Sequence, residues 1–369
     1  MKFLIISNAP TLLKDGKYYG YGPYAREMNI WAKNKEVAIC SPYEYREKLL
    51  LDEFNFDIKV FKLYPFSING FKNLFKSLII VPVNMFVIFK AMLWANHIHL
   101  RCPGNVGLLG GLIQILFPSK SKTAKYAGNW DPESKQPVSY NIQKWILSNT
   151  FLTKNMKVLV YGEWPNQTKN ILPFFTATYA QKEIINIPRK QIASQTRLIF
   201  VGALTKGKQP MLSIKVAHHL LKKGYDVRLD IYGEGNMRYE MENYIASHQL
   251  DDKVILHGNV DKELVKKAFQ VSHFLIFISK SEGWPKVVAE AMFWNCLPIT
   301  SKVSCVPYML GDNTRGKVVA SSVESVLEAL EGYLSNHQLY VSHIKNAEVW
   351  SRAYTLEKFE LEIEKLVYV

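Results

Sequence analysis

The sequence predicts an α/β protein with two domains, each built on a doubly wound parallel sheet. Its 369 residues exceed what one hydrophobic core normally holds, so two domains are expected. Short apolar runs of strand length alternate with helical segments in both halves. A polar stretch separates the two alternations. The expected organisation is a first domain at 1–180, a linker at 181–196, a second domain at 197–345 and a C-terminal helical segment at 346–369.

The composition is that of a globular protein in a reducing compartment. Hydrophobic residues make up 48% of the chain and charged residues 21%. The four cysteines form neither a C-x-x-C pair nor a metal-ligand spacing, and we expect free thiols. No signal peptide is recognisable, because the opening MKFLIISNAP is too short an apolar run and suits a first strand better. These observations predict a cytoplasmic protein.

The net charge is strongly positive. The chain has 46 Lys and Arg against 32 Asp and Glu, which gives +14. Nucleic acid, an anionic membrane surface or a phosphorylated substrate could each explain this charge, as could a generally basic surface. The basic residues are scattered, without an arginine-rich tract, a zinc knuckle or a helix-turn-helix signal. We therefore expect no nucleic-acid partner.

The N-terminal half opens as strand, glycine-containing loop, helix and strand. Lys2–Ser7 is the first expected strand, 24–34 the helix and Val37–Ser41 the next strand. The loop holds Gly20-Tyr21-Gly22, which is not G-x-G-x-x-G, so dinucleotide binding is not supported. A tight turn explains these glycines most simply, although Gly22 remains a candidate for contact with a ligand.

The most hydrophobic region is Phe71–Ala95. Pro82, Asn84 and Lys90 interrupt it, and it lacks the roughly 20 uninterrupted apolar residues of a membrane span. A helix packed in the core is the favoured interpretation. The alternative is an amphipathic surface helix that touches lipid, with basic residues near the headgroups. Those basic residues are Lys72, Lys76 and Lys90.

Polar residues follow two later strands of this half. Arg101 follows the expected strand at 97–100, and Asn129-Trp130 follows the one that starts at Ala124. In doubly wound sheets, ligands bind beyond the carboxyl ends of the strands. Arg101, Asn129 and Trp130 are therefore candidates at the mouth of the first domain, although Asn129 is more often simply a turn residue.

In the second half, successive strands end in glycine turns. Gly202, Gly233 and Gly258-Asn259 each follow a strand, and such turns let a ligand approach the backbone. After Gly202 come Lys206 and Lys208, which suit a diphosphate clamp or, equally, a solvated loop. The Walker A pattern is absent. Together these turns predict one edge of a binding cleft.

Residues 279–300 form the central motif, with the order strand, turn, helix, turn, strand. Glu282-Gly283-Trp284 forms the turn, and Pro285 suits the first position of the helix. The helix start offers an anion site, and Glu282 and Glu290 lie on either side of it. Carboxylates beside an anion site make sense if the ligand also carries hydroxyls, as a sugar or nucleotide does. No Asp-x-Asp pair or histidine-based metal spacing occurs, so we expect neither a metal nor another cofactor.

At these residues the chain resembles the family-4 glycosyltransferases, which have the GT-B fold. The similarity rests on Glu282 and Glu290 with seven residues between them, on 297–299 (LPI), on Gly202 with Lys208, and on His257-Gly258. It covers most of residues 196–320. The resemblance implies two Rossmann-like domains facing across a cleft, with the C-terminal helix returning to the first domain.

The resemblance also implies retaining, metal-independent sugar transfer from a UDP- or GDP-sugar to a lipid-linked or surface-polysaccharide acceptor. Glu282 would contact the donor sugar and Glu290 the ribose. Backbone N–H groups near Lys286 and Val287, together with Lys208, would hold the diphosphate. Separately from the resemblance, the net charge of +14 and the Phe71–Ala95 region predict association with an anionic membrane surface, at the inner face of the plasma membrane.

Three positions depart from the family pattern. Ala203 replaces an arginine, and Lys206 or Lys286 would have to supply its charge. Pro285 replaces a glycine and removes one N–H donor. Asn129-Trp130 stands near a family histidine turn, so the acceptor residues cannot be transferred from the family. Two alternatives stay open: a sugar-nucleotide epimerase on the same fold, and a basic, non-catalytic protein that binds membranes or nucleic acid.

Overall fold

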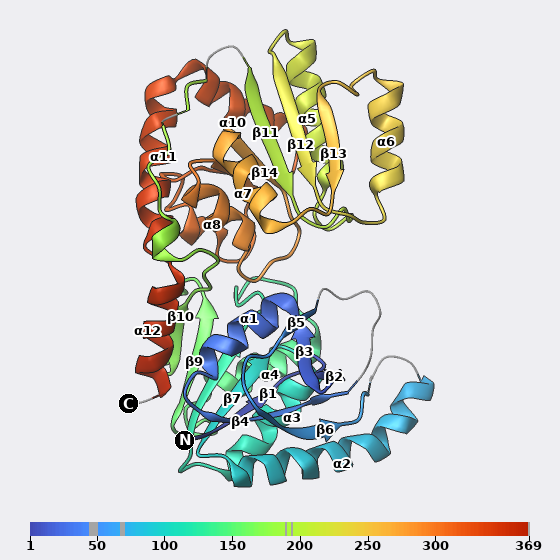
Figure 1. Cartoon of the computed structure of the whole chain (residues 1–369), viewed down its shortest axis with the longest axis vertical. Coiled ribbons are helices and arrows are strands. Elements are labelled where there is room, and N and C mark those ends of the chain that lie inside the picture. The colour runs from blue at the N-terminus through green and yellow to red at the C-terminus, as the bar shows by residue number, and fades with distance from the viewer. Residues whose placement is uncertain (44–50, 67–70, 189, 193–194, 368–369) are drawn as a thin grey trace. The chain divides into compact units, whose positions relative to one another are not determined.

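A computed structural model describes residues 1–43, 51–66, 71–188, 190–192 and 195–367, with the backbone alone for 71–76. The chain divides into two compact units (Figure 1). The first unit is Met1–Phe174 with Glu360–Val369, and the second is Phe175–Phe359. In this division the segment expected as a linker, 181–196, falls within the second unit.

The first unit contains a seven-stranded parallel sheet in the order β10-β9-β8-β7-β1-β4-β6. Its strands are β1 (Lys2–Ile6), β4 (Glu36–Pro42), β6 (Ile58–Leu63), β7 (His97–Cys102), β8 (Ser121–Tyr126), β9 (Met156–Tyr161) and β10 (Ile171–Phe174). A small antiparallel sheet is formed by β2 (Leu12–Lys14), β3 (Lys17–Tyr21) and β5 (Leu51–Glu53). The strand order reverses between β1 and β7, which makes their carboxyl ends the switch point of this sheet.

Helices cover both faces of this sheet. Right-handed crossovers place α1 (Gly22–Trp31) on one face, and α2 (Phe71–Trp94), α3 (Asn105–Ile113) and α4 (Val138–Ser148) on the other. A short 3₁₀ helix, η1 (Gln114–Leu116), extends α3. The α3 helix packs against both α2 and α4, so the three form one layer.

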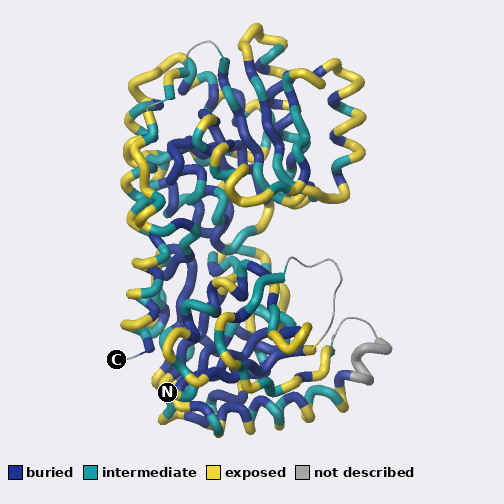
Figure 2. Tube along the Cα trace, in the orientation of Figure 1, coloured by how far each residue is buried: buried dark blue, intermediate teal, exposed yellow. Residues whose placement is uncertain are grey.

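The helix expected in the core is buried along one side only. On the inner side of α2, Ile88, Ala91 and Met92 are completely buried against the sheet. Its outer side is exposed, as the alternation of buried and exposed segments in Figure 2 shows. By length and composition, Ser77–Trp94 is the one stretch of the described chain that could cross a membrane, and 28% of it is buried.

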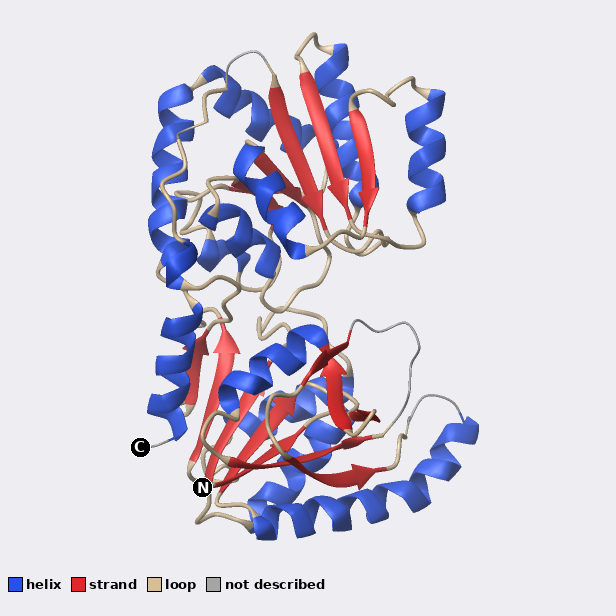
Figure 3. Cartoon of the chain, in the orientation of Figure 1, coloured by secondary structure: helices blue, strands red, loops and turns tan. Residues whose placement is uncertain are grey.

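The second unit contains a six-stranded parallel sheet in the order β13-β12-β11-β14-β15-β16. Figure 3 shows strands of this sheet with helices packed around them. Its strands are β11 (Thr196–Val201), β12 (Val227–Tyr232), β13 (Val254–Gly258), β14 (Phe274–Phe277), β15 (Leu297–Ser301) and β16 (Lys317–Val319). Its helices are α5 (Pro210–Lys222), α6 (Arg238–Ser247), α7 (Lys262–Val271), α8 (Lys286–Phe293), α9 (Val306–Met309), α10 (Val323–Ser335) and α11 (His337–Arg352). The last helix, α12 (Leu356–Val367), continues from the second unit into the first.

A buried lysine closes two helix ends in the second unit. The Lys190 ammonium donates to Phe269 O and Ser272 O at the end of α7, at 2.7 and 2.5 Å. It also donates to Trp294 O and Asn295 O at the end of α8, at 3.2 and 2.9 Å. These carbonyls have no partner within their helices, and a cation there also favours both helix dipoles.

Candidate functional site

The switch point of the second sheet lies between β11 and β14. The chain moves outward from β11 through β12 to β13, and α7 then returns it to β14 on the other side of β11. In open parallel sheets such a reversal creates the ligand crevice at the carboxyl ends of the strands. The loops after β11 and β14 meet there, because Lys280 N donates to Gly207 O at 2.9 Å.

The glycine turns lie along this edge, as expected from the sequence. Gly202 N donates to Tyr232 O, and Gly233 N donates to Gly258 O. A Cβ atom on Gly233 would lie 2.0 Å from Gly202 O, and its φ of +131° disfavours any side chain. The turns therefore pack backbone against backbone, and only glycine fits at the centre.

The loop after β14 is held by hydrogen bonds from the next strand and loop. Ser301 Oγ, at the end of β15, accepts from Ser279 N at 2.9 Å and donates to Ser279 O at 2.7 Å. Ser304 Oγ donates to Gly283 O at 2.8 Å. Trp284 is buried and stacks on Trp350 of α11. This loop is fixed before any ligand binds, which pre-organises Glu282.

Glu282 and Lys208 form an ion pair across the switch point. Lys208 Nζ donates to Glu282 Oε1, and the two side chains are 28% and 10% exposed. The sequence had offered no local partner for Glu282, because the two residues lie on loops after different strands. A cation and a carboxylate thus lie side by side beyond the strand ends, where one can bind phosphate and the other can bind hydroxyls.

Glu290 lies on the α8 helix and contacts a different segment. Thr178 Oγ1 donates to Glu290 Oε1 at 2.8 Å. Tyr179 holds this segment in place by packing on Phe293 and Trp294. Within the described chain, no side chain caps the start of α8, where Pro285 is the N-cap and not the first helical residue as expected. Asn295 ends the turn after α8 with a left-handed φ of +56°.

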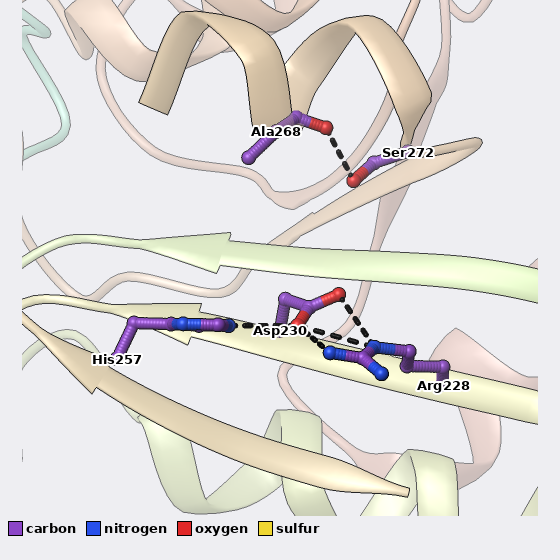
Figure 4. Close-up of polar contacts among 5 residues, drawn as sticks. All are labelled: Arg228, Asp230, His257, Ala268 and Ser272. Carbon is purple, nitrogen blue, oxygen red and sulfur yellow. Dashed lines mark hydrogen bonds and ion pairs between the residues drawn. The ribbon is translucent and has the colours of Figure 1, made fainter. Parts of the chain in front are cut away.

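A polar cluster supports the turn after β13 (Figure 4). His257 Nε2 lies 2.7 Å from Asp230 Oδ1, and Arg228 Nη2 donates to the same oxygen at 3.0 Å. Burial alone would raise the pKa of Asp230, but the hydrogen bonds from Arg228 and His257 outweigh it and lower that pKa. The His257 ring also stacks on Tyr232. The cluster fixes the strand end from which the Gly258-Asn259 turn begins.

Another predicted lysine lines a hollow next to the glycine turns. Lys206 is exposed and lines, with Lys280, Gln209 and Ser322, a neighbouring hollow of about 530 Å³. Lys280 was not anticipated, since an exposed lysine carries no distinctive signal in a sequence. Ala203 is exposed too. Among the described residues, no group of three or more His, Cys, Asp or Glu side chains could hold a metal ion.

In the first unit, Arg101 is engaged internally. Its guanidinium pairs with Glu27 of α1, and Lys125 of β8 donates to the same carboxylate at 2.9 Å. The three side chains are 13%, 8% and 1% exposed. Arg101 therefore joins α1 to the sheet in this structure, and it shares the Glu27 carboxylate with Lys125.

The remaining acceptor-side candidates have local roles. Trp130 is buried against Tyr126, and its Nε1 donates to Gln167 at 2.9 Å. Asn129 Oδ1 accepts from Asp131 N at 2.9 Å, which makes it a turn residue. Gly22 begins α1. None of these contacts marks a ligand site.

Comparison with known proteins identifies a family match within the second unit and several relatives. Residues 182–350 match the family model of glycosyl transferases group 1. A Campylobacter jejuni N-acetylgalactosamine-N,N'-diacetylbacillosaminyl-diphospho-undecaprenol 4-alpha-N-acetylgalactosaminyltransferase is 30% identical over 200 residues, 52% of each chain. The phosphatidylinositol N-acetylglucosaminyltransferase GPI3 subunit of Saccharomyces cerevisiae is 24% identical over 141 residues, 38% of this chain and 31% of its own. The matches thus span about half or less of these relatives.

Solved structures match over the whole chain. Anabaena HepE in complex with UDP and glucose has a TM-score of 0.69 at 12% identity, covering 100% of this chain and 99% of its own. Sucrose-phosphate synthase from Thermosynechococcus elongatus has a TM-score of 0.67 at 14% identity, covering 100% and 98%. At such low identity these likenesses show the fold alone. The chain has the GT-B fold, and its residues 182–350 match the family of glycosyl transferases group 1.

Proposed function

We propose that the chain is a retaining glycosyltransferase, which moves a sugar from a UDP- or GDP-sugar to a lipid-linked oligosaccharide or surface glycan. The observation that carries this proposal is the Lys208–Glu282 ion pair at the switch point of the second sheet. It presents one cation for a diphosphate and one carboxylate for sugar hydroxyls on the two loops that border the crevice.

Donor binding would exchange the partners of these groups. Lys208 turns from Glu282 to the diphosphate, which also meets the start of α8 near the N–H groups of Lys286 and Val287. Glu282 then accepts hydrogen bonds from the transferred sugar. Glu290 accepts from the ribose hydroxyls in place of the Thr178 hydroxyl that it now binds.

The transfer itself is a front-side displacement. The bond from the anomeric carbon to the diphosphate oxygen breaks, and a bond to the acceptor oxygen forms on the same face of the sugar. The acceptor proton passes to the departing diphosphate, which leaves as a nucleoside diphosphate. Lys208 and the positive end of α8 stabilise its negative charge, and the proposal requires no metal.

The proposal also includes a lipid-linked acceptor and a cytoplasmic location. The name of the Campylobacter relative specifies a diphospho-undecaprenol-linked acceptor, and HepE was solved with UDP and glucose. These support a lipid-linked acceptor and a nucleotide-sugar donor here. The free, buried state of Cys40, Cys102, Cys296 and Cys305 suits a cytoplasmic enzyme at the inner face of the plasma membrane.

A donor screen followed by one substitution tests the function. Binding of UDP, GDP and their sugar derivatives is measured by calorimetry, and the donor that binds is then used in a transfer assay with polyprenyl-diphosphate glycans. Glu282→Ala should abolish transfer while circular dichroism stays unchanged, whereas Glu331→Ala, in an exposed ion pair with Lys223, should remain active. Full activity of Glu282→Ala would refute the assignment.

A further inference from the structure

The α2–α3–α4 layer of the first unit exposes an unusual number of apolar side chains. On α2 the exposed positions recur every three or four residues and form one stripe along the helix. Neighbouring exposed side chains lie on α3 with η1, on α4 and just after α4. The set comprises Leu78, Ile79, Val83, Phe86 and Leu93, then Leu112 and Leu116, then Val138, Ile142, Trp145 and Phe151, with exposures from 41% to 77%.

The charged residues in this part of the chain are almost all positive. Residues 58–162 contain 13 Lys and Arg but only two acids, Asp131 and Glu133. This stretch therefore carries 11 of the 14 net positive charges of the whole chain. Three of its 13 cations do not contribute to the surface, because Lys122 and Lys125 are buried and Arg101 is paired with Glu27. The α2, α3 and α4 helices contain no Asp or Glu at all.

Exposed lysines stand beside exposed aromatic rings in this layer. Lys90 Nζ lies 4.4 Å from the ring centre of Phe86, and Lys154 Nζ lies 5.7 Å from that of Phe151. Apolar side chains flanked by lysines are typical of segments that lie at the boundary between headgroups and acyl chains. The side chains of Lys72 and Lys76 lie outside the described residues.

The α2 helix is fastened to its domain along its inner side. Ile88, Ala91 and Met92 are part of the core. The side chain of Asn84 accepts from Tyr64 N and donates to Tyr64 O, both at 2.9 Å. Crossing a bilayer would require these contacts to break, whereas lying on one uses only the outer stripe.

We propose that the α2–α3–α4 layer is a docking face for an anionic phospholipid bilayer, with the outer stripe of α2 inserted at the interface. Lipid phosphates supply the negative charge that the layer lacks, and acyl chains cover its apolar side chains. A surface that binds another protein would be expected to carry both positive and negative side chains, whereas the helices of this layer carry only positive ones. The proposal does not depend on the enzymatic activity.

Vesicle flotation tests the docking face without any substrate. The full chain should float with vesicles of phosphatidylcholine and phosphatidylglycerol, and less with phosphatidylcholine alone. The Val83→Glu/Phe86→Glu variant should lower the floating fraction about tenfold or more, because two carboxylates would have to enter the interface. Leu339→Glu/Val349→Glu on α11 adds the same charge at exposed apolar sites and should float as the parent does.

A fluorescent probe gives a second measurement that tolerates a folding defect in the double variant. All four native cysteines are buried, so a single introduced cysteine can be labelled selectively. An environment-sensitive dye at Val83→Cys should shift to the blue when anionic vesicles are added, and the same dye at Val349→Cys should not shift.

Three results would overturn the proposal. One is equal flotation of both double variants, and another is equal dye shifts at both positions. The third is a parent protein that ignores vesicles but forms dimers that Val83→Glu/Phe86→Glu dissociates, which would assign the layer to self-association.

Discussion

The ion pair of Lys208 with Glu282 predicts that two substitutions will change nucleotide binding in opposite directions. In the structure Glu282 pairs with Lys208, the cation proposed to bind the diphosphate, and the pair is largely buried. Glu282→Gln keeps the shape of the side chain but removes this competition, and also removes a negative charge from an anion site. UDP or GDP, whichever the parent protein binds, should therefore bind more tightly to Glu282→Gln and more weakly to Lys208→Met.

The size of the effect follows from Coulomb's law. A carboxylate roughly 5–6 Å from a phosphate charge, at an effective dielectric constant of about 20–40, costs about 1.5–3 kcal/mol. This corresponds to a gain in affinity of roughly ten- to a hundredfold for Glu282→Gln. Sugar transfer should nevertheless fall about a hundredfold or more, because Glu282 no longer accepts hydrogen bonds from the sugar as a carboxylate.

Titration calorimetry at low and high salt measures these affinities directly. Glu331→Gln is the matched control, since it removes the same charge from the exposed pair with Lys223 and should leave nucleotide affinity unchanged. Weaker or unchanged nucleotide binding by Glu282→Gln would refute the reasoning, because Glu282 would then not compete with the diphosphate for Lys208.

Three further outcomes are expected from the packing. Gly233→Ala should lower the free energy of unfolding by about 2–4 kcal/mol and abolish nucleotide binding, because the added Cβ would lie 2.0 Å from Gly202 O. The control Gly224→Ala has a φ of +88° but open space around it, so it should lower the free energy of unfolding by only about 1 kcal/mol; urea unfolding measures both. Lys190→Met should destabilise the second unit by about 3–5 kcal/mol, because the carbonyl groups at the ends of α7 and α8 lose their hydrogen-bond donor. Thermal unfolding measures this loss, with Lys223→Met, in an exposed ion pair, as the control. Burial lowers the pKa of His97 to about 3 and that of His99 well below its usual value. Below about pH 6.5 the unfolded chain therefore binds protons that the folded chain excludes. The free energy of unfolding should fall by up to about 1.4 kcal/mol per histidine for each pH unit below about 6.5. Urea unfolding across this pH range would contradict that prediction if stability stayed constant, or if replacing both histidines by glutamine left the slope unchanged.

Much of the fold and half of the site were predictable from local pattern. Apolar runs of strand length and glycine turns recur along the chain, and each element forms from neighbours in sequence. The edge formed by Gly202, Gly233 and Gly258 was expected because parallel strands end on the same side of a sheet. The sequence could not show that Lys208 pairs with Glu282, or that Thr178 binds Glu290, since these contacts join segments 74 and 112 residues apart.

The burial of individual side chains was the other property that the sequence pattern could not predict. Arg101 and Trp130 were expected at a ligand mouth, but an internal ion pair holds the first and the core encloses the second. The α2 helix was expected in the core, and its outer stripe is exposed because the sheet covers only one side of it. A sequence reports which side chains are apolar or charged, and only packing decides which of them face solvent.

The amino-acid sequence by itself determined the α/β class, the two-domain organisation, the positive charge and the Glu282–Glu290 motif, because each is written in local composition and spacing. The tertiary structure decided which loops meet at the switch point, which cation Glu282 holds and which helices expose their apolar side. Those outcomes depend on strand order and on contacts between distant segments, and these exist only once the chain has folded.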